Sequence, residues 1–239
     1  MRKISTYLLL VVILTTPLVS IAADVNEPCT GTAGASLVGN SGGSGFGEVW
    51  QDDAAADFTT ENGGVDGTAC SSVQDASDDR NFTAGLTNFS GSFSEKHVNT
   101  LNSFQVRFES TADVERFYFN FVRVGVDSSV RITGATSETI GTWSALGFKL
   151  LEFEGGDTGG SGICAANEVR ARFDGGAYSA CIGFTNAGTI DQLDLNDNGD
   201  VSGNGTLMDS LVITDTDLAG GSSQPDRTSS LTGAFFGGF

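Results

Sequence analysis

The chain has 239 residues, of which 30 are acidic and 12 are basic, so its formal net charge is −18 at pH 7. A surface this acidic repels nucleic acid and anionic membrane surfaces, and it attracts divalent cations. Composition therefore argues against a nucleic-acid-binding protein. The alternative to cation binding is an acidic surface that serves only solubility.

The first 22 residues have the pattern of a secretory signal peptide. Arg2 and Lys3 precede an apolar run over residues 7–18, and the small residues Ser20 and Ala22 follow it. The run is too short for a spanning helix, and no second apolar segment of about 18 residues follows, so we expect no integral membrane insertion. We predict a secreted protein, released by cleavage near Ala22, that acts outside the cell or at its surface.

Residues 23–102 are predicted to form a loop-rich N-terminal part of a single domain. Residues 31–47 are rich in Gly, Ser and Ala, and residues 52–79 are acidic with few large apolar side chains. Short strands are expected at Ser36–Val38, Phe46–Trp50 and Phe89–Phe93. The alternative is a partly disordered N-terminal segment.

Residues 103–218 have the pattern of a β-sandwich core, because apolar and polar residues alternate over short runs. The predicted strands are Phe104–Phe108, Arg116–Phe121, Ser129–Thr133, Leu146–Phe153, Glu168–Phe173, Tyr178–Phe184 and Leu207–Thr214. Asp174, Gly175 and Gly176 form a tight-turn signal that predicts a β-hairpin. Since no segment shows sustained helical spacing, we predict an all-β fold, an antiparallel β-sandwich or jelly roll with long Gly/Asp-rich loops.

The four cysteines of an exported chain predict two disulfides. Three pairings are possible in principle. Sequential pairing joins Cys29 to Cys70 and Cys164 to Cys181, and the second pair brackets the predicted hairpin. The rival, a cysteine-based metal site, lacks a CxxC pair.

A calcium-loop pattern begins at Asp194. Oxygen ligands at alternate positions, followed by a glycine at the sixth position, are typical of a loop that folds around calcium. The position-twelve carboxylate is missing, because Gly205 occupies that place, and Asp209 or Asp191 is the predicted substitute. The predicted metal ligands are Asp194, Asn196, Asn198, Asp200, Ser202 and Asp209. The alternative is an Asn/Asp/Gly-rich turn that needs no metal.

No catalytic residue is predicted. His97 is the only histidine, and no nucleophile motif such as GxSxG accompanies it. Carboxylate pairs such as Glu152 with Glu154 are compatible with a glycosidase, but 30 acidic residues produce such pairs by chance. Among the aromatic residues, Trp50, Trp143 and Tyr178 are the candidates for a sugar-stacking platform, with core or loop-anchor roles as the alternative.

The C-terminal segment, residues 219–239, is a polar linker followed by an apolar, uncharged strand that contains three phenylalanines. That strand is predicted either to close its own sheet or to add to the edge of a second copy. We therefore predict a secreted, non-catalytic structural or adhesive protein, a surface or matrix component with a calcium-stabilised loop. Its expected partners are itself or extracellular glycans. The alternative function is a calcium-dependent carbohydrate-binding module, and the third is a secreted glycoside hydrolase.

Overall fold

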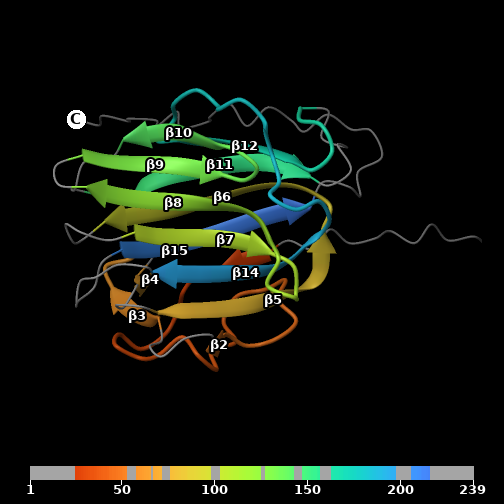
Figure 1. Cartoon of the computed structure of the whole chain (residues 1–239). Helices are drawn as coiled ribbons and strands as arrows, with labels where there is room; N and C mark the ends of the chain where they lie inside the picture. The colour runs from red at the N-terminus through yellow and green to blue at the C-terminus, as the bar shows by residue number, and fades with distance from the viewer. Residues whose placement is uncertain are drawn as a thin grey trace, which may run out of the picture.

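The structure is a computed structural model that describes residues 25–52, 58–65, 67–71, 76–97, 103–124, 127–142, 147–156, 163–197 and 206–215. These residues form strands and no helix, and the strands make two antiparallel sheets packed face to face. Figure 1 shows the two layers, with the sheet that contains β7 in front and the sheet that contains β6 behind it. The all-β fold and the antiparallel β-sandwich are confirmed.

The sheet behind, here the β6 sheet, has the strand order β13-β12-β11-β6-β15-β4-β3, and β1 also pairs with β15. Its strands are β1 (Val25–Glu27), β3 (Thr59–Asn62), β4 (Thr68–Ser71), β6 (Asn88–His97), β11 (Lys149–Gly156), β12 (Glu168–Phe173), β13 (Ile182–Gly183) and β15 (Thr206–Asp215).

The sheet in front, here the β7 sheet, has the order β10-β9-β8-β7-β14-β5-β2. Its strands are β2 (Gln51–Asp52), β5 (Ser77–Leu86), β7 (Ser103–Glu109), β8 (Glu115–Val124), β9 (Asp127–Thr133), β10 (Ser137–Thr142) and β14 (Ile190–Asp197).

One core fills the space between the sheets, because each strand turns its apolar residues to the same side. Phenylalanines dominate it, and full burial of each stabilises the fold by about 1.5–3 kcal/mol. Phe153 of β11 contacts the opposite sheet, with ring centroids 5.2 Å from Phe108 and 5.3 Å from Phe119. Gly91, the register partner of Phe153, leaves room for that ring, since an added Cβ would lie 2.4 Å from its Cζ atom.

The N-terminal part of the chain is built into both sheets. β6 pairs with β11 and β15, and β5 pairs with β14 and β2. The predicted strand Phe89–Phe93 lies in the first half of β6, whereas Ser36 and Phe46 form only isolated bridges. β5 was not expected, because two of its inward positions carry Asp78 and Arg80 instead of apolar residues.

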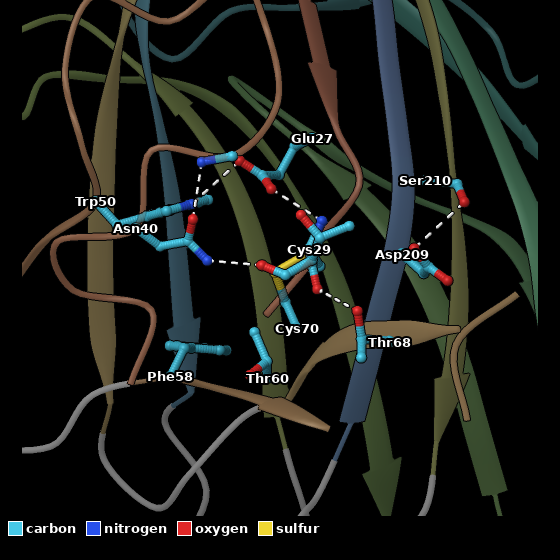
Figure 2. Close-up of a disulfide and its surroundings, with 12 residues drawn as sticks. Glu27, Cys29, Asn40, Trp50, Phe58, Thr60, Thr68, Cys70, Asp209 and Ser210 are labelled. Atoms are coloured by element: carbon cyan, nitrogen blue, oxygen red, sulfur yellow. Dashed lines mark hydrogen bonds between the residues drawn. A yellow bond between two sulfur atoms is a disulfide. The ribbon is translucent and has the colours of Figure 1, made fainter. Parts of the chain in front are cut away.

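A buried polar network joins these N-terminal loops to the sandwich (Figure 2). Glu27 accepts hydrogen bonds from the backbone N–H of Cys29 at 2.9 Å and from Nε1 of Trp50 at 3.1 Å, and it pairs with Arg80 at 2.6 Å. Burial raises the pKa of Glu27, while its hydrogen bonds and Arg80 oppose that rise. The network stabilises long loops that contribute few strand hydrogen bonds of their own.

Both predicted disulfides are present. Cys29 is bonded to Cys70, and Cys164 is bonded to Cys181. The predicted tight turn lies between Cys164 and Cys181 in the chain. Asp174 and Gly175 have positive φ, and the N–H of Gly176 donates to the Phe173 carbonyl. The strand after the turn is shorter than predicted, because only Ile182–Gly183 pairs with β12.

Within the described ranges no helix has the length and hydropathy needed to cross a membrane. The predicted signal peptide and the apolar C-terminal strand lie outside the described residues.

Candidate functional site

The outer face of the β7 sheet carries polar side chains across five adjacent strands, and we call it the polar face. It is the surface turned toward the viewer in Figure 1. The pairing registers align its side chains in cross-strand rows. From β9 to β5, one row is Arg131, Asn120, Gln105, Asn196 and Ser77; the next is Thr133, Tyr118, Arg107, Asp194 and Asp79; a shorter third row is Glu109, Gln192 and Asn81.

At the centre of the polar face lies a hydrogen-bonded group that we call the Arg107 cluster. It comprises Ser77, Gln105, Arg107, Asp194 and Asn196. Arg107 donates from Nε to Gln105 at 2.7 Å and from its two terminal nitrogens to Asp194 at 3.4 Å and Asn196 at 3.2 Å. Ser77 donates to Asp194 at 3.0 Å and accepts from the Asn196 amide at 3.2 Å.

The cluster has a buried floor and a surface layer. Gln105, Ser77 and Asp194 are buried, whereas the Arg107 side chain is 25% exposed and Asn196 is half-buried. The buried partners therefore hold the two surface groups in fixed orientations. Because the Asp194 carboxylate is desolvated, its pairing with Arg107 and Ser77 also prevents an uncompensated buried charge.

The surface groups retain hydrogen-bonding capacity. A guanidinium has five N–H donors, and three of those on Arg107 are used within the cluster, which leaves two. Asn196 uses one amide hydrogen and one lone pair of its oxygen. The cluster thus presents both donors and an acceptor in fixed positions at the surface.

Tyr118 lies next to Arg107 on β8, as its register partner. Its ring is half-buried and faces outward, since Phe117 and Phe119 on either side face the core. On the same strand, Asn120 accepts a hydrogen bond from Ser103 at 3.0 Å. An aromatic ring therefore adjoins the polar groups of the cluster on one continuous face.

Glu109 is the perturbed titratable group of the polar face. Burial, and then the neighbouring Asp194 carboxylate, raise the pKa of Glu109 to about 7, while Arg107 lowers it. Glu115 and Asp113 also raise the pKa. Its register partner is Gln192, whose buried Oε1 accepts no hydrogen bond from the described residues.

Of the predicted calcium ligands that the structure describes, Asp209 does not lie with Asp194 and Asn196. Asp194 and Asn196 lie in strand β14, and both Asp194 oxygens already accept hydrogen bonds from the cluster. Asp209 lies in the other sheet, where it accepts from Val65 N–H at 2.5 Å, with its neighbour Ser210 beside it (Figure 2). The core separates Asp209 from the polar face, so it does not complete a site with Asp194.

The described ligands thus do not fit the predicted calcium loop, because a cation at Asp194 would have to displace Arg107. Asn198, Asp200 and Ser202 lie outside the described residues. In the part of the chain that is described, the two close groups of potential metal ligands are Glu27, Cys29 and Cys70, and Cys164, Glu168 and Cys181. Both contain disulfide-bonded cysteines, whose sulfur atoms are not available as thiolate ligands.

The predicted aromatic platform is not assembled. Trp50 is 1% exposed and donates to Glu27, so it belongs to the core and has no ring face for a sugar, contrary to the ligand-binding prediction. Trp143 lies outside the described residues. Tyr178 lies against the outer side of the β6 sheet, with its ring centroid 4.5 Å from the Arg170 guanidinium and 4.7 Å from that of Arg172.

The carboxylates near Tyr178 are also engaged. Glu152 pairs with Arg172 at 2.7 Å, and Glu154 pairs with Arg170. Each of the two carboxylates thus has an arginine partner, and these ion pairs explain their position without assigning them a catalytic role. His97 is the last residue of β6, where it pairs with Thr206.

Gln105, Arg107, Tyr118, Asn120 and Ser77 were not predicted as site residues. For the four residues on β7 and β8 the signal was present in the alternation of these strands, which places polar residues opposite a phenylalanine-rich face. Alternation does not reveal which strands are neighbours, however. The cluster becomes visible only when β14 is placed between β7 and β5.

No protein-family model and no curated protein sequence matches the chain. Solved structures resemble it in fold. A sialidase matches with a TM-score of 0.53 at 12% identity, over 70% of this chain and 17% of the sialidase chain. The Ca²⁺/Man2-bound exoplasmic/lumenal domain of VIP36 matches with a TM-score of 0.46 at 10% identity, over 85% of this chain and 90% of that domain.

A third neighbour is the carbohydrate-binding module CBM66 from Bacillus subtilis, with a TM-score of 0.43 at 9% identity, over 69% of this chain and 94% of the module. At such identities the likeness concerns the β-sandwich fold alone. The chain spans less than a fifth of the sialidase that it matches.

Proposed function

We propose that this chain is a carbohydrate-binding β-sandwich and that the polar face binds the glycan. One observation carries the proposal: Arg107 and Asn196 are held by buried partners and still present unused donors and an acceptor at the surface. Sugar hydroxyls both donate and accept, so they match a site with fixed groups of both kinds. Preorganisation lowers the entropic cost of binding.

Tyr118 supports the same ligand class. A sugar ring has an apolar face as well as hydroxyls, and an aromatic side chain with a polar tip suits such a surface. Tyr118 lies in the same row as Arg107. A ligand that crosses the strands therefore meets a ring and planar polar groups in succession.

The shape of the site favours an extended glycan chain. The polar face crosses five adjacent strands from β9 to β5, and four spacings between strands make about 19 Å. In Figure 1 these five strands lie side by side toward the viewer. Several consecutive sugars fit along such a row.

Catalysis and calcium are not needed for this function. The pairs Glu152–Arg172 and Glu154–Arg170 engage one of the carboxylate pairs that were compatible with a glycosidase. Calcium stays a prediction for the residues beyond Asp197, and we propose no contact between calcium and the glycan. The structural or adhesive role stays a prediction too, since it depended on the C-terminal strand outside the described residues.

An extracellular setting is part of the proposal. The predicted signal peptide supports it, and so do the two disulfides, which form and persist in oxidising compartments. Extracellular glycans are accordingly the proposed partners.

The test compares matched variants on the two outer faces. Purified protein lacking residues 1–22 is run by affinity electrophoresis in gels that contain a panel of soluble polysaccharides, and retained ligands are then titrated by calorimetry. We expect Tyr118→Ala and Arg107→Lys each to weaken binding about tenfold or more, because Lys loses the guanidinium's fixed donor geometry. Circular dichroism melts establish that each variant is folded.

Tyr178→Ala and Arg172→Lys are the controls, because they make the same changes on the β6 sheet, where Arg172 also pairs with a carboxylate. They should bind like the wild type. Loss of binding in the controls with retention in the polar-face variants would move the site to Tyr178. Absence of binding to every polysaccharide would overturn the proposed function.

A further inference from the structure

We infer that the β8–β9 end of the polar face is a subsite for the carboxylate of an acidic sugar and that Arg131 is its ion-pairing residue. This inference rests on the proposed function and specifies the ligand class. It predicts a glycan with an acidic sugar over β8 and β9 and neutral sugars over the Arg107 cluster.

Among the basic side chains that the structure describes, Arg131 is the one without a hydrogen bond, ion pair or ring contact; Lys96, for example, lies over the Phe148 ring. Five of those residues pair with carboxylates, namely Arg80, Arg107, Lys149, Arg170 and Arg172. Arg116 donates to the backbone carbonyls of Thr189 and Asn186. Arg131 is exposed and forms neither a hydrogen bond nor an ion pair with any described residue. In a chain with 30 acidic residues, an unpaired arginine at a candidate binding surface is a distinctive feature.

The groups around Arg131 are neutral. Its register partners are Asn120 on β8 and Thr139 on β10. The Asn120 oxygen accepts from Ser103, and its amide N–H groups donate to no described residue. Glu138 is adjacent to Thr139 but is paired with inward-facing Ile132, so it projects to the other side of the sheet. The end of the row therefore presents donors and no described carboxylate.

The acidic groups of the polar face lie away from Arg131: Glu109 is on β7, two strands away and in a different cross-strand row. Asp194 is on β14, three strands from Arg131, and Asp79 is on β5, four strands away. Three spacings make about 14 Å, which exceeds the screening length of about 8 Å at physiological ionic strength. Arg107 also pairs with Asp194. The described carboxylates of the polar face therefore do not neutralise Arg131.

The distribution of charge also selects the kind of glycan. A polymer with a carboxylate on every sugar would place negative groups over Asp194, Asp79 and Glu109, in a chain whose net charge is −18. Like charges in contact disfavour that complex. A glycan with one acidic sugar among neutral ones avoids the repulsion. A planar guanidinium then donates two parallel hydrogen bonds to the carboxylate.

The experiment uses two polysaccharides with sparse uronic acids, glucuronoxylan and gellan, each in native and carboxyl-reduced form, with polygalacturonate as the densely charged comparison. We expect the wild type to bind at least one native polymer about tenfold more tightly than its reduced form, as a charge-assisted hydrogen bond implies. Arg131→Gln should remove that preference and leave affinity for the reduced form unchanged. Arg170→Gln, which lowers the charge equally on the other sheet, should keep the preference.

The outcomes separate the two claims. Equal binding of native and reduced polymers, preferred binding of polygalacturonate, or an unchanged preference in Arg131→Gln would overturn the acidic-sugar subsite. In each of these cases the glycan site on the polar face is still supported if the Tyr118→Ala variant loses binding. If neither sparse polymer binds in either form while neutral glycans bind, the subsite is also overturned. If no glycan binds at all, the proposed function itself fails.

Discussion

Replacing Glu109 with Gln removes one titratable group from the polar face. The pH dependence of the unfolding free energy should therefore change within a defined pH range. The unperturbed carboxyl has a pKa of 4.5, whereas burial and Asp194 raise the pKa of Glu109 in the folded protein to about 7. Between these values the unfolded chain has lost its proton and the folded chain keeps it. Unfolding therefore releases a proton, and wild-type stability falls as pH rises from 4.5 through 7.

The size of the effect follows from the shift. Full conversion would give about 3 kcal/mol, but screening by solvent near the surface reduces it to roughly 1–2 kcal/mol. Glu109→Gln keeps the size and polarity of the side chain and cannot ionise. Its stability relative to the wild type should therefore increase by that amount between pH 5 and pH 8. The amide also retains a donor toward Gln192, the register partner.

The assay is urea denaturation of both proteins at pH 5, 6, 7 and 8, followed by circular dichroism. Glu95, whose pKa burial raises to about 8, contributes in the same direction to both proteins and cancels in the difference. A difference in unfolding free energy that stays constant from pH 5 to pH 8 would refute the reasoning. So would a wild type that gains stability relative to the variant as pH rises.

Three further predictions concern stability and the ion. Trp50→Phe should lower the unfolding free energy by about 1–3 kcal/mol, measured in urea, because buried Glu27 loses a hydrogen-bond donor; an unchanged midpoint would contradict the network. Replacing Cys164 and Cys181 with Ala should cost about 3 kcal/mol through a less constrained unfolded chain, and equal stability with and without the bond would refute this. If the segment after β14 binds calcium, wild type should melt at a higher temperature in millimolar calcium than in chelator, and Asp200→Ala should abolish the rise; identical wild-type melting curves would end the calcium prediction.

The strands that build most of the core could be predicted from the sequence. In Phe104–Phe108 and Arg116–Phe121 every second residue is apolar, and these segments form β7 and most of β8. The disulfides could be predicted as well, because sequential pairing closes short loops and one loop brackets a turn. In both cases the determining pattern is local in the chain.

Strand β14 of the polar face was harder to predict, because its residue pattern also matches that of a calcium-binding loop. Asp194 and Asn196 alternate with the buried Leu193 and Leu195, which is strand spacing. The same spacing places oxygen ligands at positions one and three of a calcium loop. The local sequence does not distinguish a strand from a calcium loop. The pairing of Asp194 and Asn196 with β7 and β5 shows that this segment is a strand.

β5 illustrates a second limit. Its inward positions include Asp78, which accepts from Phe58 N–H at 2.9 Å, and Arg80, which pairs with Glu27. Polar groups are stable there only because partners distant in the chain satisfy them. Hydrophobic alternation is therefore absent from the sequence, although the strand is ten residues long.

The central claim is that the polar face binds a glycan, and chemical-shift mapping tests it most directly. Protein labelled with ¹⁵N is titrated with an oligosaccharide prepared from the best polysaccharide of the affinity gels, and amide shifts are followed by NMR. The account predicts that the largest shifts fall on outward-facing residues of β7, β8 and β14, with Arg107, Tyr118 and Asn196 among them. Largest shifts on β11 and β12 around Tyr178, with the polar face unchanged, would contradict it.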